Sequence, residues 1–139
     1  MTRDDAVRLV KAVFKAVGQE SPGLSEKGFG GLMLGTAQMY FEHQPPDGPL
    51  LSRAHIYTFR NDPKPAALAS LRAEEAAGTA AGGGSFEFVP ESRAAFLTRS
   101  YPAPVDEAAF VQQAGELGAA SLEWREGALQ RAFEKARGS

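Results

Sequence analysis

Two histidines, His43 and His55, are the residues best suited to acid–base catalysis or metal binding, and each lies in a segment with the pattern of a β-strand. If the turn between these strands is centred on Asp47, His55 lies opposite Met39, four residues from His43. At about 3.4 Å per residue, the two imidazoles are then more than about 10 Å apart. A shared metal must lie about 2 Å from each nitrogen, so this spacing argues against a metal site.

Other catalytic motifs are missing from the sequence. The absence of cysteine excludes thiolate nucleophiles and thiolate metal ligands. No serine lies in a G-x-S-x-G or S-x-x-K motif, and Glu42, next to His43, points to the opposite face of a strand. We therefore predict no enzyme activity, catalytic residue, metal or cofactor. The alternative is a small enzyme or small-ligand-binding protein that uses His43 or His55 with a nearby acid.

Two glycine-rich segments raise the question of phosphate binding. Residues 28–31 precede a predicted strand, whereas a phosphate-binding loop follows one, and residues 78–84 lack the Lys-Ser/Thr ending of a P-loop. Both segments are therefore predicted to be ordinary loops, and residues 79–84, with little to bury, are expected to be mobile. The helical carboxylates alternate with arginines, which is typical of solvated faces.

Composition limits the function classes further. A chain of 139 residues with 43% hydrophobic and 23% charged residues predicts a single domain over residues 1–139. Its formal net charge of −2 provides no basic excess for nucleic acid or an anionic membrane. The sequence shows no signal-peptide pattern and no apolar run near the ~20 residues of a membrane-spanning helix, so we expect a cytoplasmic protein.

The first half of the chain predicts a helix, a hairpin and a second helix. Apolar residues at helical spacing predict a helix over 2–17, capped by Thr2 and ended by Gly18. Strands are predicted at 32–43, with a possible split at Gly35, and at 50–59, joined by the proline-rich turn 44–49. A second helix is predicted over 66–77, with Asp62 as its cap and proline in its first turn.

The second half predicts a hairpin of strands at 86–89 and 94–101, then a helix capped by Asp106 that runs to Arg137. At about 1.5 Å per residue, this helix is nearly 50 Å long and exceeds the ~30 to 40 Å width of such a domain. We expect it to break, bend or project, with Gly115, Gly118 and Gly127 as weak points. The order α-β-β(-β)-α-β-β-α predicts an α+β fold in which helices pack on an antiparallel sheet.

Apolar side chains on the first predicted strand provide a candidate binding surface. Met33, Met39, Tyr40 and Phe41 occupy both of its faces, so one face can pack under helices while the other meets a partner. On this interpretation, a charge at Met39 or Phe41 leaves folding largely intact. In the second helix, Leu68 and Leu71 could pack against a symmetry mate or simply cover the sheet.

The last third of the chain carries a recognisable pattern. A strand and turn over 86–91 are followed by a second strand over 95–101 that ends in Tyr101, then by a helix capped by Asp106. Leu117 and Trp124-Arg125 lie further along that helix. The pattern resembles class I type III secretion chaperones, the CesT-like family. The order of the earlier elements extends the resemblance to nearly the whole chain.

This resemblance implies a homodimer that binds an extended segment of a secreted effector or another protein, without catalysis or nucleotide. Its first helix and first hairpin would form the partner groove, and its second helix would lie near the dimer axis. A regulatory or adaptor dimer of the same fold with no secretion role is a further alternative. The expected partner-binding residues are Val10, Phe14, Met33, Met39 and Phe41, and the expected dimer-interface residues are Leu68 and Leu71.

Overall fold

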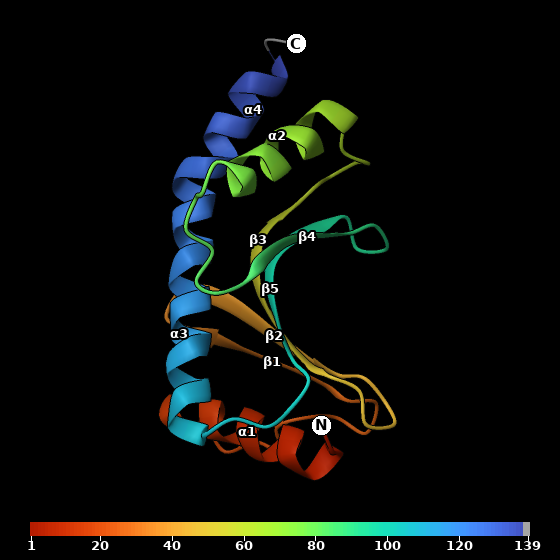
Figure 1. The fold of residues 1–139 in the computed structure, drawn as a ribbon, viewed down its shortest axis with the longest axis vertical. Coiled ribbons are helices and arrows are strands. Elements are labelled where there is room, and N and C mark those ends of the chain that lie inside the picture. Colours follow the sequence, from red (N-terminus) through yellow and green to blue (C-terminus); the bar gives the residue numbers. More distant parts are fainter. Residues whose placement is uncertain (138–139) are drawn as a thin grey trace.

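The computed structural model describes residues 1–137 and contains one antiparallel sheet with strand order β1-β2-β3-β5-β4 (Figure 1). The α+β fold and the element order expected from the sequence, including the extra strand, are confirmed. The elements are α1 (Arg3–Ala16), β1 (Phe29–Leu34), β2 (Ala37–His43), β3 (Leu50–Thr58), α2 (Pro65–Ala76), β4 (Ser85–Val89), β5 (Ala94–Tyr101), α3 (Glu107–Glu123), the π-helical segment η1 (Trp124–Ala128) and α4 (Leu129–Arg137).

Local signals at the helix ends explain where α1 and α3 begin. The Thr2 hydroxyl accepts a hydrogen bond from the Asp5 N–H at 3.2 Å, and the Asp106 carboxylate accepts one from the Ala109 N–H at 3.3 Å. Gly18, at φ 75°, takes the left-handed conformation that follows α1. The predicted Asp62 cap of α2 is wrong, because α2 begins at Pro65 with Lys64 as a cap that makes no side-chain hydrogen bond.

The region predicted as one strand over 32–43 is a hairpin of β1 and β2, split at Gly35, whose φ is 61°. β1 begins at Phe29, inside the segment predicted as a loop. β2 and β3 pair with Met39 opposite Ala54, one residue away from the predicted pairing with His55. Because strand side chains alternate, this one-residue difference places His43 on the buried face and His55 on the other face.

One face of the sheet is covered by α3, which packs across β2, β3 and β5 and also against α1. Gly118 permits this close approach: a Cβ there would lie 3.2 Å from the Ala37 Cβ and 3.4 Å from the Met39 Sδ. Within residues 1–137, no helix covers the opposite face, which is concave in Figure 1. We call this the open face of the sheet. The largest fully buried side chains are Trp124, Phe41, Phe110, Leu9 and Met39.

The C-terminal helix neither breaks nor ends early. It runs along the whole length of the molecule and passes through the π-helical turn at Trp124–Ala128 (Figure 1). Its last part, α4, packs against α2, so it does not project unsupported. None of the helices within residues 1–137 combines the length and apolarity needed to cross a membrane.

The glycine-rich loop 79–84, expected to bury little, packs closely on α3. A Cβ at Gly82 would lie 2.5 Å from the Glu116 carbonyl oxygen, and one at Gly84 would lie 2.6 Å from the Leu117 Cδ1. The Trp124 indole N–H also donates to the Ala80 carbonyl at 3.0 Å. The glycines therefore serve close packing of loop backbone against a helix.

Four of the five predicted partner-binding residues lie in the protein's own core: Val10, Phe14, Met39 and Phe41 are at most 7% exposed. Only Met33, at 48%, is on the surface. The hairpin turn explains the difference, because in one continuous strand Met33 would share a face with Met39, whereas the turn places it opposite Gln38 on the open face. The expectation that a charge at Met39 or Phe41 leaves folding intact is therefore wrong.

The two predicted dimer-interface residues are also buried, to different degrees. Leu71 is fully buried in the core, and Leu68 is half-buried. Leu71 therefore packs inside the protein itself, in agreement with the interpretation in which the second helix covers the sheet.

We predict that Phe41→Ala lowers the free energy of unfolding by about 3–5 kcal/mol, because it leaves a cavity in a closed core. The control Phe29→Ala, at a side chain that is 54% exposed, should change it by less than about 0.5 kcal/mol. Urea unfolding monitored by circular dichroism gives both values. Equal effects of the two substitutions would contradict the described burial.

α2 is tied to α4 by one ionic cluster. The Glu74 carboxylate accepts hydrogen bonds from the Arg131 Nε at 2.8 Å and Nη2 at 3.1 Å, and from the Thr79 hydroxyl at 2.8 Å. The hydrogen bonds from Arg131 hold the pKa of Glu74 below its usual value, against the opposing effect of burial. The ionised carboxylate is therefore the form that stabilises the fold.

We predict that Glu74→Gln lowers the melting temperature at pH 7, because the glutamine removes the charge that Arg131 contacts. Since the folded-state pKa of Glu74 is lowered, its contribution is present above the unfolded-state pKa and is lost as the pH falls through the folded-state pKa. The difference between the two proteins should therefore shrink below about pH 4.3. Thermal melts from pH 7 to pH 3 measure it, and a constant difference across this range would contradict the role of the charge.

Candidate functional site

The outer edge of β1 offers unpaired backbone groups. The His43 N–H donates to the Gly28 carbonyl at 2.8 Å, so Gly28 bonds toward β2. In an antiparallel pair, only every second residue of a strand bonds to its neighbour. The backbone groups of Phe29, Gly31 and Met33 therefore point away from β2. Ser25 satisfies both backbone groups of Phe29: the Ser25 N–H donates to the Phe29 carbonyl, and the Ser25 hydroxyl accepts from the Phe29 N–H. Within residues 1–137, the N–H and C=O groups of Gly31 and Met33 have no partner.

Exposed apolar side chains lie directly beside this edge. Phe29, Met33 and Tyr40 are 54%, 48% and 43% exposed, and all three lie on the open face of the sheet. The Tyr40 ring lies over Gly31, where a Cβ would be only 3.3 Å from the Tyr40 Cδ1. We call Phe29, Gly31, Met33 and Tyr40 the β1 surface. A free strand edge flanked by apolar side chains is the geometry that accepts an added strand.

The other edge of the sheet is better protected. α2 packs on β4, and the Glu75 carboxylate accepts a hydrogen bond from the Phe86 N–H. Natural proteins commonly cover a sheet edge in this way, because an open edge pairs with other chains. By the same alternation, the Phe88 backbone and the Phe86 carbonyl also face outward on β4 without a hydrogen bond within residues 1–137, so β1 is the edge with more free backbone groups, those of Gly31 and Met33.

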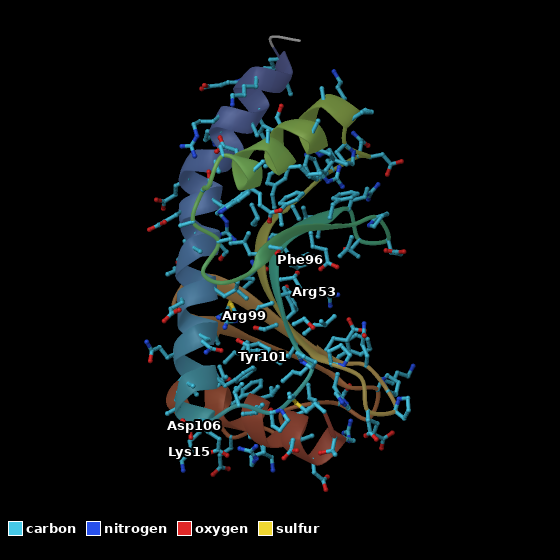
Figure 2. The ribbon with its side chains drawn as sticks, viewed as in Figure 1. Lys15, Arg53, Phe96, Arg99, Tyr101 and Asp106 are labelled. Atoms are coloured by element: carbon cyan, nitrogen blue, oxygen red, sulfur yellow. The ribbon has the colours of Figure 1, made fainter. Side chains whose placement is uncertain are left out.

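The centre of the open face is polar. Arg53 forms ion pairs with Glu42 at 2.7 Å and with Glu87 at 2.8 Å, and Thr98 donates to Glu87 at 2.7 Å. Although burial acts to raise the pKa of Glu87, the hydrogen bonds from Arg53 and Thr98 hold it below its usual value. Arg53 and Phe96 both lie on this face (Figure 2). The exposed apolar contacts are therefore concentrated at the β1 end of the sheet.

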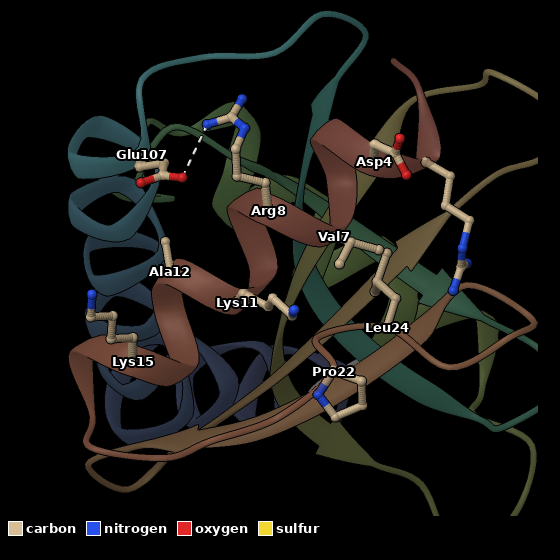
Figure 3. Close-up of a pocket in the computed structure, with 10 residues that line it drawn as sticks. Asp4, Val7, Arg8, Lys11, Ala12, Lys15, Pro22, Leu24 and Glu107 are labelled. Carbon is tan, nitrogen blue, oxygen red and sulfur yellow. Dashed lines mark hydrogen bonds and ion pairs between the residues drawn. The ribbon is translucent and has the colours of Figure 1, made fainter.

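A second surface feature, which we call the α1 groove, runs along α1 (Figure 3). Its volume is about 760 Å³, and it lies between α1, the segment around Pro22 and Leu24, and the start of α3. Gly23, at φ 82°, holds this segment against α1, since a Cβ there would lie 3.1 Å from the Val7 carbonyl oxygen. The lining residues are Arg3, Asp4, Val7, Arg8, Lys11, Ala12, Lys15, Pro22, Leu24 and Glu107.

The two histidines do not form a site together. His43 is buried, and its Nε2 lies 2.8 Å from the Met1 carbonyl oxygen. His55 lies on the open face, where its Nε2 is 2.7 Å from the Thr58 hydroxyl and its Nδ1 is buried without a hydrogen bond. Burial, and secondarily the charge of Arg125, lower the pKa of His55 and favour the neutral imidazole.

The surroundings of the histidines lack acid–base partners. The depression beside His55, about 510 Å³, is lined by Gln38, Tyr40, Thr58, Ser92, Ala94 and Phe96, none of which is a carboxylate. Within residues 1–137, neither histidine has a hydrogen bond or ion pair to an acid, and no three His, Asp or Glu residues are placed to hold a metal.

Sequence reasoning identified Met33 and Tyr40 but missed Phe29 and the basic side chains of α1. Phe29 was missed because glycines surround it and suggested a loop. The alternation of Phe29, Gly31 and Met33 with Gly30, Leu32 and Leu34 was the signal for a strand with one exposed face.

Comparison with known proteins identifies the fold through solved structures. No protein-family profile matches the chain, and no curated protein sequence matches it. A chain in the crystal structure of the ExsC–ExsE complex superposes with a TM-score of 0.69 at 15% identity, covering 91% of this chain and 96% of that one. A chain of the HopA1–SchA chaperone–effector complex superposes with a TM-score of 0.63 at 11% identity, covering 91% and 99%. The protein therefore has a type III secretion chaperone-like fold, as the resemblance in its sequence implied.

Proposed function

We propose that this protein binds an extended segment of a secreted effector or another partner protein, which adds as a strand to the edge of β1. The observation that carries this proposal is the pair of unpartnered residues Gly31 and Met33, whose free backbone groups lie beside exposed Phe29 and Tyr40. In strand addition, main-chain hydrogen bonds provide affinity and neighbouring side chains provide specificity.

The shared fold supports a chaperone-like role. One of the similar structures is a chaperone–effector complex, and the superposition covers nearly all of both chains. On this proposal, the protein holds its partner segment and carries out no chemistry on it.

We also propose that the protein is a homodimer, with α2 near its axis. The outward face of α2 carries the small exposed side chains Ala69, Ala73 and Ala76 together with Arg72, and Leu68 is half-buried beside them. Small side chains allow two helices to approach closely. Leu71 contributes indirectly, by holding α2 to the core.

Binding of an alternating Val-Thr decapeptide, labelled with fluorescein, tests the strand-addition proposal through fluorescence anisotropy. We expect saturable binding, weakened roughly tenfold or more by Phe29→Ser combined with Met33→Ser, because each removes buried apolar contact worth about 1 kcal/mol. Val17→Ser, at an apolar side chain that is 39% exposed at the end of α1, is the matched control.

The same peptide, N-methylated at alternate residues, separates strand addition from unspecific apolar binding. Methylation removes the N–H groups that would pair with β1, so binding should be lost. Unchanged affinity of the methylated peptide would show that the edge of β1 is not the site.

Light scattering over a dilution series tests the dimer. We expect a mass near 29.6 kDa, twice the 14.8 kDa of one chain. Ala73→Arg, at an exposed position of α2, should reduce the mass to that of a monomer while leaving the far-UV circular dichroism spectrum of the folded chain unchanged. A monomer at all concentrations would contradict the dimer, and a dimer that persists in Ala73→Arg would contradict the place of α2.

A further inference from the structure

The α1 groove concentrates positive charge on a protein whose formal net charge is −2. Four cationic side chains line it, Arg3, Arg8, Lys11 and Lys15, against two carboxylates, Asp4 and Glu107. All six are exposed. The groove is thus locally basic, in contrast to the chain as a whole.

The internal ion pairs do not neutralise this charge. Arg8 pairs with Glu107 at 3.2 Å and with Asp5 at 3.5 Å (Figure 3 shows the first of these). Arg3 donates to the Ser25 carbonyl at 3.0 Å, so its charge meets no carboxylate there. Within residues 1–137, Lys11 and Lys15 have no hydrogen bond or ion pair.

Helix stability explains only some of the positions of the cations along α1. Lys15 lies in the last turn of α1, where a cation is favoured by the helix dipole. Arg3 lies in the first turn, where the dipole disfavours a cation, and Lys11 lies mid-helix without an acidic neighbour in contact. The hydrogen bond to the Ser25 carbonyl gives Arg3 a structural role, whereas neither the helix nor a contact within residues 1–137 explains the cation at Lys11.

We infer that the α1 groove binds an acidic stretch of the extended partner segment, an inference that rests on the proposed function. From Arg3 to Lys15 the cations span twelve residues of helix, or about 18 Å. At about 3.3 Å per residue, five or six residues of an extended chain match this length. Apolar Val7, Pro22 and Leu24 lie between the cations, so the groove suits Asp or Glu interspersed with apolar residues.

One segment of chain joins the groove to strand β1, which it meets on the face opposite the β1 surface. Gly23, which packs on α1, also packs on β1, because a Cβ at Gly30 would collide with the Gly23 carbonyl oxygen. Pro22 and Leu24, on either side of Gly23, line the groove. Because the free edge of β1 lies between its two faces, one partner segment can pair with that edge and continue across this connection into the groove.

Three peptides test the inference by fluorescence anisotropy: the alternating Val-Thr decapeptide alone, and the same peptide joined through a Gly-Ser linker to six glutamates or to six lysines. We expect the glutamate peptide to bind roughly tenfold tighter than the decapeptide at 50 mM NaCl, and the lysine peptide to bind no tighter. The gain should shrink at 300 mM NaCl, because salt screens exposed charges.

Charge-reversed variants test whether the gain in affinity from glutamate arises at the α1 groove. Lys11→Glu combined with Lys15→Glu should remove the gain from glutamate and leave the affinity of the decapeptide unchanged. Arg60→Glu combined with Arg93→Glu makes the same change in net charge at exposed positions that line neither the groove nor the outward face of α2, and should retain the gain.

The outcomes separate this inference from the proposed function. If the decapeptide binds but glutamate adds nothing, or if the gain survives in the Lys11 and Lys15 variant, the acidic preference is overturned and strand addition stands. If only the glutamate peptide binds, and the variant abolishes it, the groove is confirmed while strand addition at β1 fails. Equal binding of a twelve-base-pair DNA duplex, lost in the same variant, would reassign the groove to nucleic acid and overturn the inference.

Discussion

The close contact between α3 and the sheet determines the rest of the architecture. It is possible because the buried side of α3 carries small residues, Ala114, Gly118 and Ser121, and because Gly118 has no Cβ, which would lie 3.2 Å from the Ala37 Cβ. With the helix this close, Met39 and Phe41 have no route to solvent. The helices are then committed to one side of the sheet, and the open face and the edge of β1 remain for other molecules.

The two sheet edges differ because the two ends of the molecule are built differently. At the β4 end, α2 supplies Glu75 to a backbone N–H and is itself held to α4 through Glu74 and Arg131. At the β1 end, Ser25 satisfies only the first residue of the strand and leaves the next two outward-facing residues free. The segment that carries Ser25 also forms one wall of the α1 groove, so the free edge and the basic groove are neighbouring parts of one surface.

Much of the fold could be predicted because its signals are local. Thr2 and Asp106 cap their helices as expected, and the hairpin of β4 and β5 agrees with its sequence pattern. Which apolar side chains of this region are exposed could not be predicted, because their exposure depends on a turn at Gly35 that moves Met33 to the face opposite Met39. The glycines at 82–84 were also misjudged, since close approach to α3 depends on tertiary packing that composition does not reveal. The basic groove arises only when α1, the segment after it and α3 come together.

The π-helical turn at Trp124–Ala128 lies against an irregularity of β3, where the pairing register shifts between His55 and Tyr57. Arg125 links the two by donating to the Ile56 carbonyl at 3.2 Å and the His55 carbonyl at 3.3 Å. A π turn and a β-bulge each contain one residue more than the regular element. In evolution, an insertion or deletion in one should therefore be matched by a length change in the other, and alignments of homologous chains should show gaps at these two places together.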